Sequence, residues 1–395
     1  MIIVKKMRFL LLLCFLVELS PLRAQLADSI RFSLLTCAPG QEIYELFGHT
    51  AIRYQNFTRN EDYVFNYGMF SFRTPNFVYR FVKGETDYQL GITPYIYFEA
   101  EYAMRGSSVY QQVLNLTEAE KQKLYGLLRE NYLPQNRIYR YNYFYDNCTT
   151  RARDQIEKAI SGTVVYPEAV PVSSFREIVH HYTDGFPWDE FGIDLCLGAE
   201  ADAPIGIRQQ MFAPFYMKEF ASQAYIVSAD GSRRPLVSEE IKIVDVEPDP
   251  AESSFLLSPF VCALLFLILN IWIAWLQYRN RRIYWGWDII LYGIQGIAGC
   301  VIAFLFFFSV HPTVDSNWML MLFNPIPLVY LPIMVCRVIR RKKDLYHWIN
   351  LSYLTIFIVL IPLCGQKINL TVLPLALGLL VNAASHVLVS KKRIE

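Results

Sequence analysis

The distribution of apolar residues divides the chain into two regions. From Gln25 to about Val244, charged and aromatic residues are interleaved over short intervals, as in a soluble domain. From Phe255 onward long apolar runs dominate, and five are long enough, or nearly so, to cross about 30 Å of hydrocarbon. They are Phe255 to Leu276, Tyr284 to Ser309, Trp318 to Val335, Tyr346 to Leu363, and Leu370 to Val389. The pattern therefore predicts a soluble domain followed by an all-α transmembrane bundle of about five helices.

A shorter apolar run stands at the N-terminus. Phe9 to Val17 is too short to span a bilayer as an ordinary helix, and three basic residues precede it. This is the pattern of a secretory signal peptide. We expect residues 1–24 to be that signal, with cleavage after Ala24.

Basic residues in alternate loops predict the orientation of the spans. Arginines and lysines gather at 279–282, 337–343 and 391–393, whereas the loops 310–317 and 365–369 carry only Lys367. The positive-inside rule places the basic loops in the cytoplasm and the N-terminal domain outside.

The same patterns predict the domain boundaries of a multi-pass protein of the bacterial inner membrane. We expect residues 25–244 to form an extracytoplasmic domain and residues 255–395 the transmembrane domain. Residues 245–254 contain two prolines and several acids, which is typical of a short extended linker.

Within the soluble region, three elements can be predicted from local patterns. Residues 51–54 and 63–67 look like two strands of a hairpin, separated by a polar turn. Thr117 and Glu120 have the spacing of a capping box, and apolar residues at helical intervals follow up to about Tyr132.

The segment around Cys148 is the most informative part of the chain. Ala152, Ile156 and Ile160 share one helical face, so Asp146 or Asn147 would cap a helix and Cys148 would lie in its first turn. Unsatisfied N–H groups and the macrodipole favour a thiolate there, and the same N–H groups can stabilise an oxyanion. Cys148 is therefore the candidate nucleophile.

A thiolate nucleophile also needs a base. Of the histidines at 49, 180 and 181, His49 stands behind Gly48 at the start of a predicted strand, and Asn66 on the next strand is suited to orient its ring. The candidate catalytic residues are thus Cys148, His49 and Asn66. Taken singly, each also fits a structural role: a buried or disulfide-bonded cysteine, a satisfied histidine at a strand edge, and a turn asparagine.

Composition narrows the function classes. A formal net charge of +1 with 53% hydrophobic residues leaves no basic stripe for a phosphate backbone, so we expect no nucleic-acid partner. The rival nucleophile Cys37 precedes a Pro-Gly turn with no helix start to activate it. His180 and His181, with Glu177 one turn before, fit a solvated helix face better than a metal site. We expect neither a metal nor a cofactor.

Four sequence blocks carry a family resemblance. F-G-H-T-A-I-R-Y (47–54), V-F-N-Y-G (64–68), F-V-K-G-E-T-D-Y (81–88) and Y-D-N-C-T-T-R (145–151) resemble the periplasmic domain of the Lnb family, the lipoprotein N-acyltransferases of Bacteroides-type bacteria. The order His, Asn, Cys also resembles circularly permuted papain-like folds, including the lecithin:retinol acyltransferase group. NlpC-type peptidases use similar parts with the cysteine first.

The resemblance implies a fold and an activity. The fold would be a papain-like, NlpC-like, permuted α+β domain. The activity would move a fatty acyl chain from a phospholipid donor, as a Cys148 thioester, to the α-amine of a diacylglyceryl-cysteine lipoprotein. Two other functions stay open: a membrane-anchored cysteine amidase or peptidase acting on cell-wall peptide, and a non-enzymatic envelope assembly module in which Cys148 is structural.

Overall fold

The structure is a computed structural model that describes residues 30–168, 171–246, 255–340, 342 and 344–392. The predicted signal peptide, residues 1–24, lies outside the described residues, as does most of the predicted linker.

The chain folds into two compact units. The first, here called the sheet unit, comprises the residues up to Ser71, Asp87–Pro171 and Ile207–Asp249. The second, the membrane unit, comprises Phe72–Thr86, Val172–Gly206 and the residues from Pro250 onward. Two segments of the region 25–244 thus belong to the same unit as the apolar C-terminal helices.

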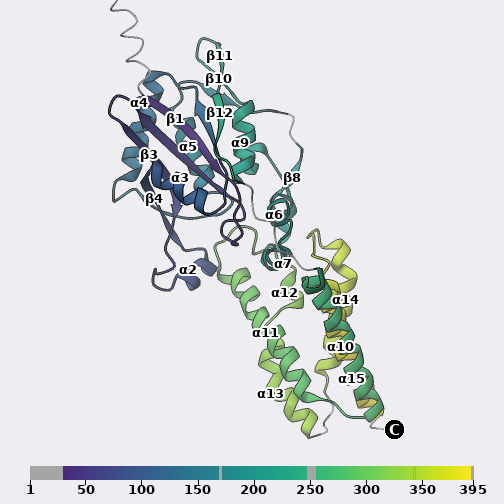
Figure 1. The fold of residues 1–395 in the computed structure, drawn as a ribbon. Helices are drawn as coiled ribbons and strands as arrows, with labels where there is room; N and C mark the ends of the chain where they lie inside the picture. The colour runs from purple at the N-terminus through teal and green to yellow at the C-terminus, as the bar shows by residue number, and fades with distance from the viewer. Residues whose placement is uncertain (1–29, 169–170, 247–254, 341, 343, 393–395) are drawn as a thin grey trace, which may run out of the picture. The chain divides into compact units, whose positions relative to one another are not determined.

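A seven-stranded sheet, antiparallel throughout, forms the centre of the sheet unit (Figure 1). The strand order is β12-β5-β1-β2-β3-β4-β6. The strands are β1 (Ile30–Cys37), β2 (His49–Asn56), β3 (Glu61–Met69), β4 (Asp87–Pro94), β5 (Val109–Leu114), β6 (Ile138–Arg140) and β12 (Val237–Val244). The predicted hairpin strands lie within β2 and β3, which confirms that pairing.

Side chains of a strand alternate between the two faces of a sheet. The strand β1 places apolar side chains on both faces, and helices cover both. Phe32 and Leu34 pack in one core with residues of α4 (Glu118–Tyr132), α5 (Cys148–Ala159) and α9 (Pro214–Gln223). Leu35 and Cys37 pack in a second core with Phe98 of α3 (Tyr95–Met104). The sheet and its helices give the predicted α+β class.

The capping box predicted at the start of α4 is present. Thr117 accepts a hydrogen bond from the Glu120 N–H, and the Glu120 carboxylate accepts one from the Thr117 N–H. The remaining elements of the sheet unit are short: β7 (Thr163–Val165), α8 (Ile207–Gln210), β10 (Tyr225–Val227) and β11 (Arg233–Pro235), of which the three strands form a second sheet.

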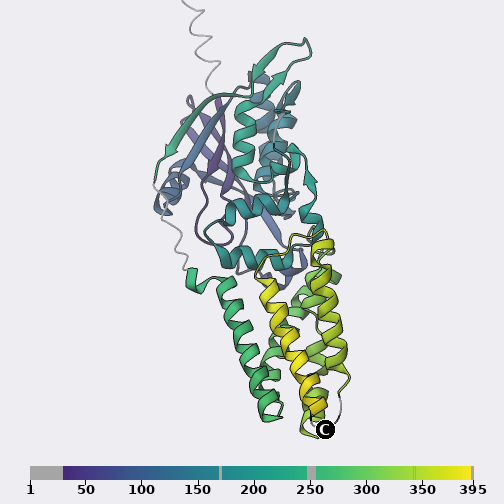
Figure 2. The same cartoon turned by 90° about the vertical axis from the view of Figure 1, so that its right-hand side faces the viewer.

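Among the described residues of the membrane unit, five helical stretches are long and apolar enough to cross a membrane, as predicted (Figure 2). The third is broken, because Phe323, Asn324 and Pro325 separate two helices and the proline cannot continue the first. The helices are α10 (Pro259–Asn280), α11 (Trp285–Phe308), α12 (Met319–Leu322) with α13 (Ile326–Ile339), α14 (Tyr346–Leu360) followed by the 3-10 turn η3 (Ile361–Leu363), and α15 (Val372–Lys392).

Polar side chains inside these spans join neighbouring helices. Asn382 of α15 donates to Asp288 of α11, and Gln295 of α11 donates to the Leu322 carbonyl of α12. The Trp287 indole N–H donates to Asn270 of α10. Because hydrocarbon offers no hydrogen bonds, such pairs hold helices together.

The rest of the membrane unit comes from two inserted segments. One carries α2 (Phe77–Lys83) between β3 and β4. The other carries β8 (Ser173–Ser174), α6 (Phe175–Thr183), α7 (Pro187–Cys196), the 3-10 turn η1 (Ala199–Asp202) and β9 (Pro204–Ile205). A further 3-10 turn, η2 (Phe255–Leu257), leads into α10.

Candidate active site

Asn147 fixes the start of α5 and hence the position of Cys148, the first residue of that helix. The Asn147 side-chain oxygen accepts hydrogen bonds of 2.9 Å from the N–H groups of both Thr149 and Thr150. Its amide donates to the carbonyls of Tyr143 and Phe212. Of the two caps that the sequence left open, the structure therefore has Asn147, whereas Asp146 forms an ion pair with Arg151.

The cap also limits which backbone groups can receive an anion. The N–H groups of Thr149 and Thr150 are already engaged by Asn147, so Cys148 supplies the first-turn N–H that remains for an oxyanion next to its own sulfur. The sequence predicted a group of such donors, and the structure reduces it to this one within the helix.

His49 is the first residue of β2, and the residue before it, Gly48, occupies a position that accepts no side chain. Gly48 has φ +74°, and a Cβ added there would lie 2.4 Å from the carbonyl oxygen of Cys37. The chain can therefore turn sharply into β2 and present the imidazole at the strand end, where it is half-buried.

Asn66 and Cys148 both lie beside the His49 ring. The Nε2 atom of His49 lies 3.3 Å from Oδ1 of Asn66, and the ring is near enough to the Cys148 thiol for each group to shift the pKa of the other. Because Nε2 faces Asn66, Nδ1 is the nitrogen left for the thiol. The structure thus brings together all three residues that the sequence singled out.

Burial and mutual attraction act in opposite directions on the two titrating groups. Burial raises the pKa of the Cys148 thiol, but the charge and hydrogen bond of His49, with the Thr50 N–H and the Thr149 hydroxyl, outweigh it and lower the pKa below its ordinary value of 9.0. Burial lowers the pKa of His49, yet Cys148 and Asn66 outweigh it and raise that pKa above 6.5. Both shifts favour a thiolate–imidazolium pair.

A buried threonine pair that the sequence analysis missed joins the two halves of the site. The hydroxyls of Thr50 and Thr149 lie 3.0 Å apart, and both side chains are fully buried. Thr50 follows His49 and Thr149 follows Cys148, so this hydrogen bond holds α5 against β2 beside the candidate base and nucleophile. Only the position of each threonine next to a candidate residue could have suggested it.

Gly68 lies close to Cys148, and Tyr88, Tyr139 and Tyr141 pack in the same core as this cysteine. A Cβ added to Gly68, which has φ +85°, would lie 3.5 Å from the Cβ of Cys148, and the β3–β4 register is irregular there, between Asn66 and Met69. Tyr141 stacks on Tyr88 with ring centroids 4.1 Å apart. Burial, with a smaller contribution from the charge of Cys148, raises the pKa of Tyr88 to about 12.

Of the aromatic residues at 139–145, only some pack in the core that contains Cys148. Tyr139 and Tyr141 pack in the same core as Cys148. Burial, with a smaller contribution from the charge of Cys148, raises the pKa values of both tyrosines well above 10. Phe144 instead packs against Phe212, with ring centroids 5.0 Å apart.

The other thiols of the extracytoplasmic segments lie in different surroundings. Cys37, Cys148 and Cys196 are all free, so none of them forms the disulfide that was one alternative reading of Cys148. Cys37 is fully buried, and burial raises the pKa of its thiol far above the ordinary value. That environment suppresses the thiolate a nucleophile requires.

His180 and His181 were assigned to a solvated helix face, and the structure gives His180 a specific partner instead. Its Nε2 lies 2.9 Å from Oδ1 of Asp194, and Glu190 completes a group of possible metal ligands. Arg176 and Asn369 also donate to Asp194, so its carboxylate is already satisfied by three donors. Glu177, the residue weighed with the two histidines as a possible metal ligand, pairs with Lys367 instead.

Two family models match the chain. The model described as the Lnb N-terminal periplasmic domain matches residues 21–181, and the one described as the Lnb transmembrane domain matches residues 250–394. All of the candidate site residues lie inside the first match. Neither the curated proteins nor the solved structures contain a match to the chain.

Proposed function

We propose, from the premise that this chain belongs to the Lnb family, that it is a lipoprotein N-acyltransferase with Cys148 as nucleophile, His49 as base and Asn66 as the group that orients His49. The donor would be a phospholipid of the membrane and the acceptor a diacylated lipoprotein. We place the enzyme in the inner membrane, with its N-terminal domain in the periplasm.

In the first step the Cys148 thiolate attacks the carbonyl carbon of a phospholipid ester. The tetrahedral oxyanion that forms accepts a hydrogen bond from the Cys148 N–H. When the C–O bond breaks, imidazolium His49 protonates the leaving glycerol oxygen. The products are a lysophospholipid, neutral His49 and an acyl group held as a thioester on Cys148.

In the second step the neutral α-amine of the lipoprotein's N-terminal cysteine attacks the thioester. His49 takes the proton from the nitrogen as the C–N bond forms, and the Cys148 thiolate leaves. The thiolate–imidazolium pair is thereby restored, and the lipoprotein carries an amide-linked third chain. His49 therefore donates a proton in the first step and accepts one in the second.

Asn66 contributes through geometry. With Nε2 of His49 hydrogen-bonded to Asn66 at 3.3 Å, the ring keeps Nδ1 toward the sulfur in both protonation states. Asn66 is itself held by its donation to the Thr93 hydroxyl, so the ring has a fixed partner on a strand of the sheet.

The membrane unit favours lipid substrates over cell-wall peptide. A soluble substrate needs at most a tether, for which a single helix would suffice, whereas this chain devotes five spans to the bilayer. Donor, acceptor and enzyme then diffuse in one plane, which raises the frequency of encounter.

The juxtaposition of Cys148, His49 and Asn66 at the start of α5 carries this proposal. Its test is mass spectrometry of the N-terminal peptide of a reporter lipoprotein, made in cells with the wild-type chain or with Cys148→Ser. We expect an amide-linked third chain with the wild type and a loss of at least about 10³-fold with the variant, because a hydroxyl is a far weaker nucleophile here.

The matched control is Cys196→Ser, which removes another free thiol outside the proposed machinery and should keep full acylation. Expression and folding are checked for each variant. Unchanged diacylated lipoproteins in wild-type cells would point to cell-wall peptide as the substrate. Acylation that survives Cys148→Ser would exclude Cys148 as the nucleophile. A variant that is less stable but shows no selective loss of acylation would favour an assembly module.

A further inference from the structure

The short helix α2 packs against a membrane span rather than standing free in a loop. The ring of Tyr79 lies 5.9 Å from that of Phe304, and Phe304 is one turn before the end of α11. At 1.5 Å per residue, this contact lies about 6 Å below the last residue of the span. Part of α2 is therefore level with the final turn of α11.

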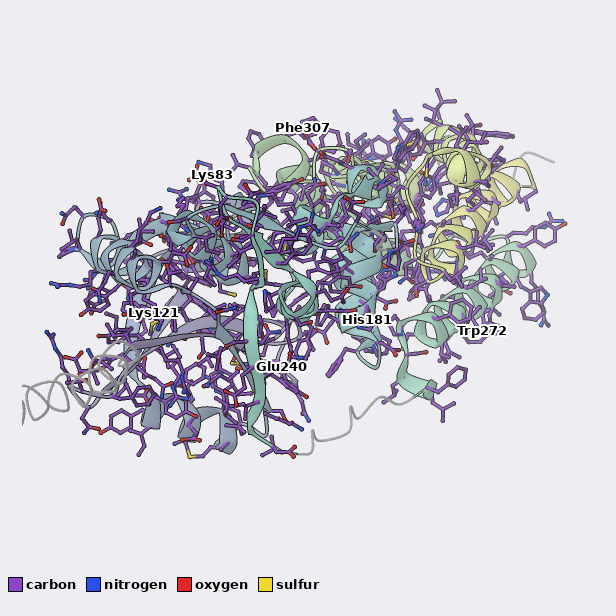
Figure 3. All side chains as sticks on the ribbon, turned by 90° about the horizontal axis from the view of Figure 1, so that it is seen from above. Lys83, Lys121, His181, Glu240, Trp272 and Phe307 are labelled. Atoms are coloured by element: carbon purple, nitrogen blue, oxygen red, sulfur yellow. The ribbon has the colours of Figure 1, made fainter. Side chains whose placement is uncertain are left out.

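Backbone contacts fix the C-terminal end of α2 at the same place. The Val310 N–H donates to the Lys83 carbonyl, and the Ser309 hydroxyl donates to the Val82 carbonyl. Gly84 caps the helix with φ +76°. A Cβ there would lie 2.9 Å from the backbone nitrogen of His311, so the two segments are in close backbone contact. Figure 3 labels Lys83 and Phe307 on these two neighbouring segments.

The composition and exposure of α2 are unusual for a helix next to water. Its seven residues are five apolar ones and two cations, Arg80 and Lys83. Val78, Tyr79 and Phe81 are 73%, 56% and 45% exposed. An exposed apolar face beside basic residues is typical of helices that lie in the membrane interface. Lys83 is itself paired with Glu85 at 2.9 Å.

A second group of exposed apolar residues lies at the start of α10. Phe255, Leu256 and Leu257 of η2 are each more than two-thirds exposed, at 78%, 73% and 67%. Trp188 of α7, itself 53% exposed, donates its indole N–H to the Leu257 carbonyl at 2.8 Å. Tryptophan is enriched at membrane interfaces because its ring is apolar and its N–H needs a polar partner.

Both groups belong to the periplasmic ends of spans. The N-terminal domain is periplasmic, so α10 starts on that side and α11, the next span, ends on it. The exposed residues of α2 continue the exposed lipid-facing surface of α11, whose last two residues, Phe307 and Phe308, are 64% and 65% exposed.

We infer that α2, α7 and η2 carry an apolar rim, made of Val78, Tyr79, Phe81, Trp188 and Phe255–Leu257, that is inserted into the periplasmic leaflet of the bilayer. The partner is the boundary between lipid acyl chains and headgroups. This inference rests on the membrane unit alone and does not depend on the acyl-transfer chemistry. It makes the segment between β3, which carries Asn66, and β4 a lipid-contacting element.

The test places a photoreactive p-benzoylphenylalanine at 79, 78 or 188 in the full chain, reconstituted in vesicles of phosphatidylethanolamine and phosphatidylglycerol. The matched control is the same residue at 57, because Phe57 is 55% exposed, like Tyr79, but lies in the polar β2–β3 turn of the sheet unit. After irradiation, mass spectrometry identifies what each position has captured.

We expect lipid adducts at 79, 78 and 188 and none above background at 57. Three probe positions guard against one substituted chain that fails to fold. An absence of lipid adducts at all three positions, or equal adducts at 57, would overturn the inference. Capture of a second polypeptide at 79 and 188 would also overturn it, because the rim would then be a protein interface.

Discussion

At the scale of single residues, the site depends on how His49 and Cys148 change each other's titration. Burial alone would keep the thiol protonated, and the neighbouring imidazole reverses that effect. The pKa of Cys148 is lowered and that of His49 is raised, and both shifts favour a thiolate–imidazolium pair. Under the proposed mechanism, activity should therefore rise with pH as the thiol ionises and fall again as His49 loses its proton.

Replacing His49 tests this coupling directly. In His49→Ala the burial that raises the pKa of Cys148 remains, while the largest lowering contribution is gone. We expect the pKa of Cys148 to rise from below 9.0 to above it. The measurement is the pH dependence of iodoacetamide alkylation, read by mass spectrometry of the peptide that contains Cys148.

The control for that experiment is Asn66→Ala, which leaves an imidazole in place without its Nε2 partner and should give a smaller upward shift. An unchanged alkylation profile in His49→Ala would show that the thiolate owes nothing to His49, and would leave the helix start and the Thr50 N–H as the stabilising groups.

At the scale of elements, glycines decide how closely the spans approach. A Cβ at Gly299 of α11 would lie 2.3 Å from the backbone carbon of Asn324, in the break between α12 and α13. The break therefore packs directly on the backbone of α11. One turn away, Gln295 donates a hydrogen bond to the Leu322 carbonyl at the end of α12, which satisfies that carbonyl. The interrupted third span is thus matched to a specific helix.

Two glycines of one helix provide a test of this packing. Gly299→Ala must push the two backbones apart, whereas Gly293→Ala on the same helix meets no atom within 4 Å. We expect Gly299→Ala to lower the melting temperature in detergent and Gly293→Ala to leave it unchanged or raise it slightly, since alanine favours helices. Equal effects of the two changes would contradict the close contact.

At the scale of the whole molecule, a buried ionic network connects the segment 172–206 to the apolar helices within the membrane unit. Arg176 is fully buried and binds Asp194 at 2.6 Å and Asp202 at 2.9 Å. These two carboxylates also accept hydrogen bonds from Asn369 and Lys367, in the loop between η3 and α15. The segment 172–206 is thereby held on the ends of the spans.

Removing the central cation should release this connection. Arg176→Met keeps much of the side-chain volume but leaves two buried carboxylates without their shared partner, at a cost of about 3 to 5 kcal/mol. Arg208→Met, which removes an arginine with two surface ion pairs, should cost no more than about 1 kcal/mol. For each variant, the melting temperature measures the loss of stability, and limited proteolysis within residues 172–206 measures the release of that segment. Similar losses would mean that burial of the network is unimportant.

Much of this protein follows from sequence patterns because the patterns are local. Uninterrupted apolar length is enough to predict a span, and a capping box or an Asn-Cys pair before an apolar helical face is enough to predict where α4 and α5 begin. The candidate residues could be chosen because few side chains can act as a thiolate or its base. Their chemical role remains a prediction, although the structure brings them together.

The sequence alone determined the five apolar spans, the start of the capped helix α4, and the choice of Cys148, His49 and Asn66 as candidates. Only the tertiary structure decided what depends on contacts between distant residues. These include the Thr50–Thr149 hydrogen bond, the partner of His180, the burial of Cys37, and the packing of α2 and α7 on the spans. The reason is physical: a local pattern reports which face of an element is apolar, but not which surface will cover that face.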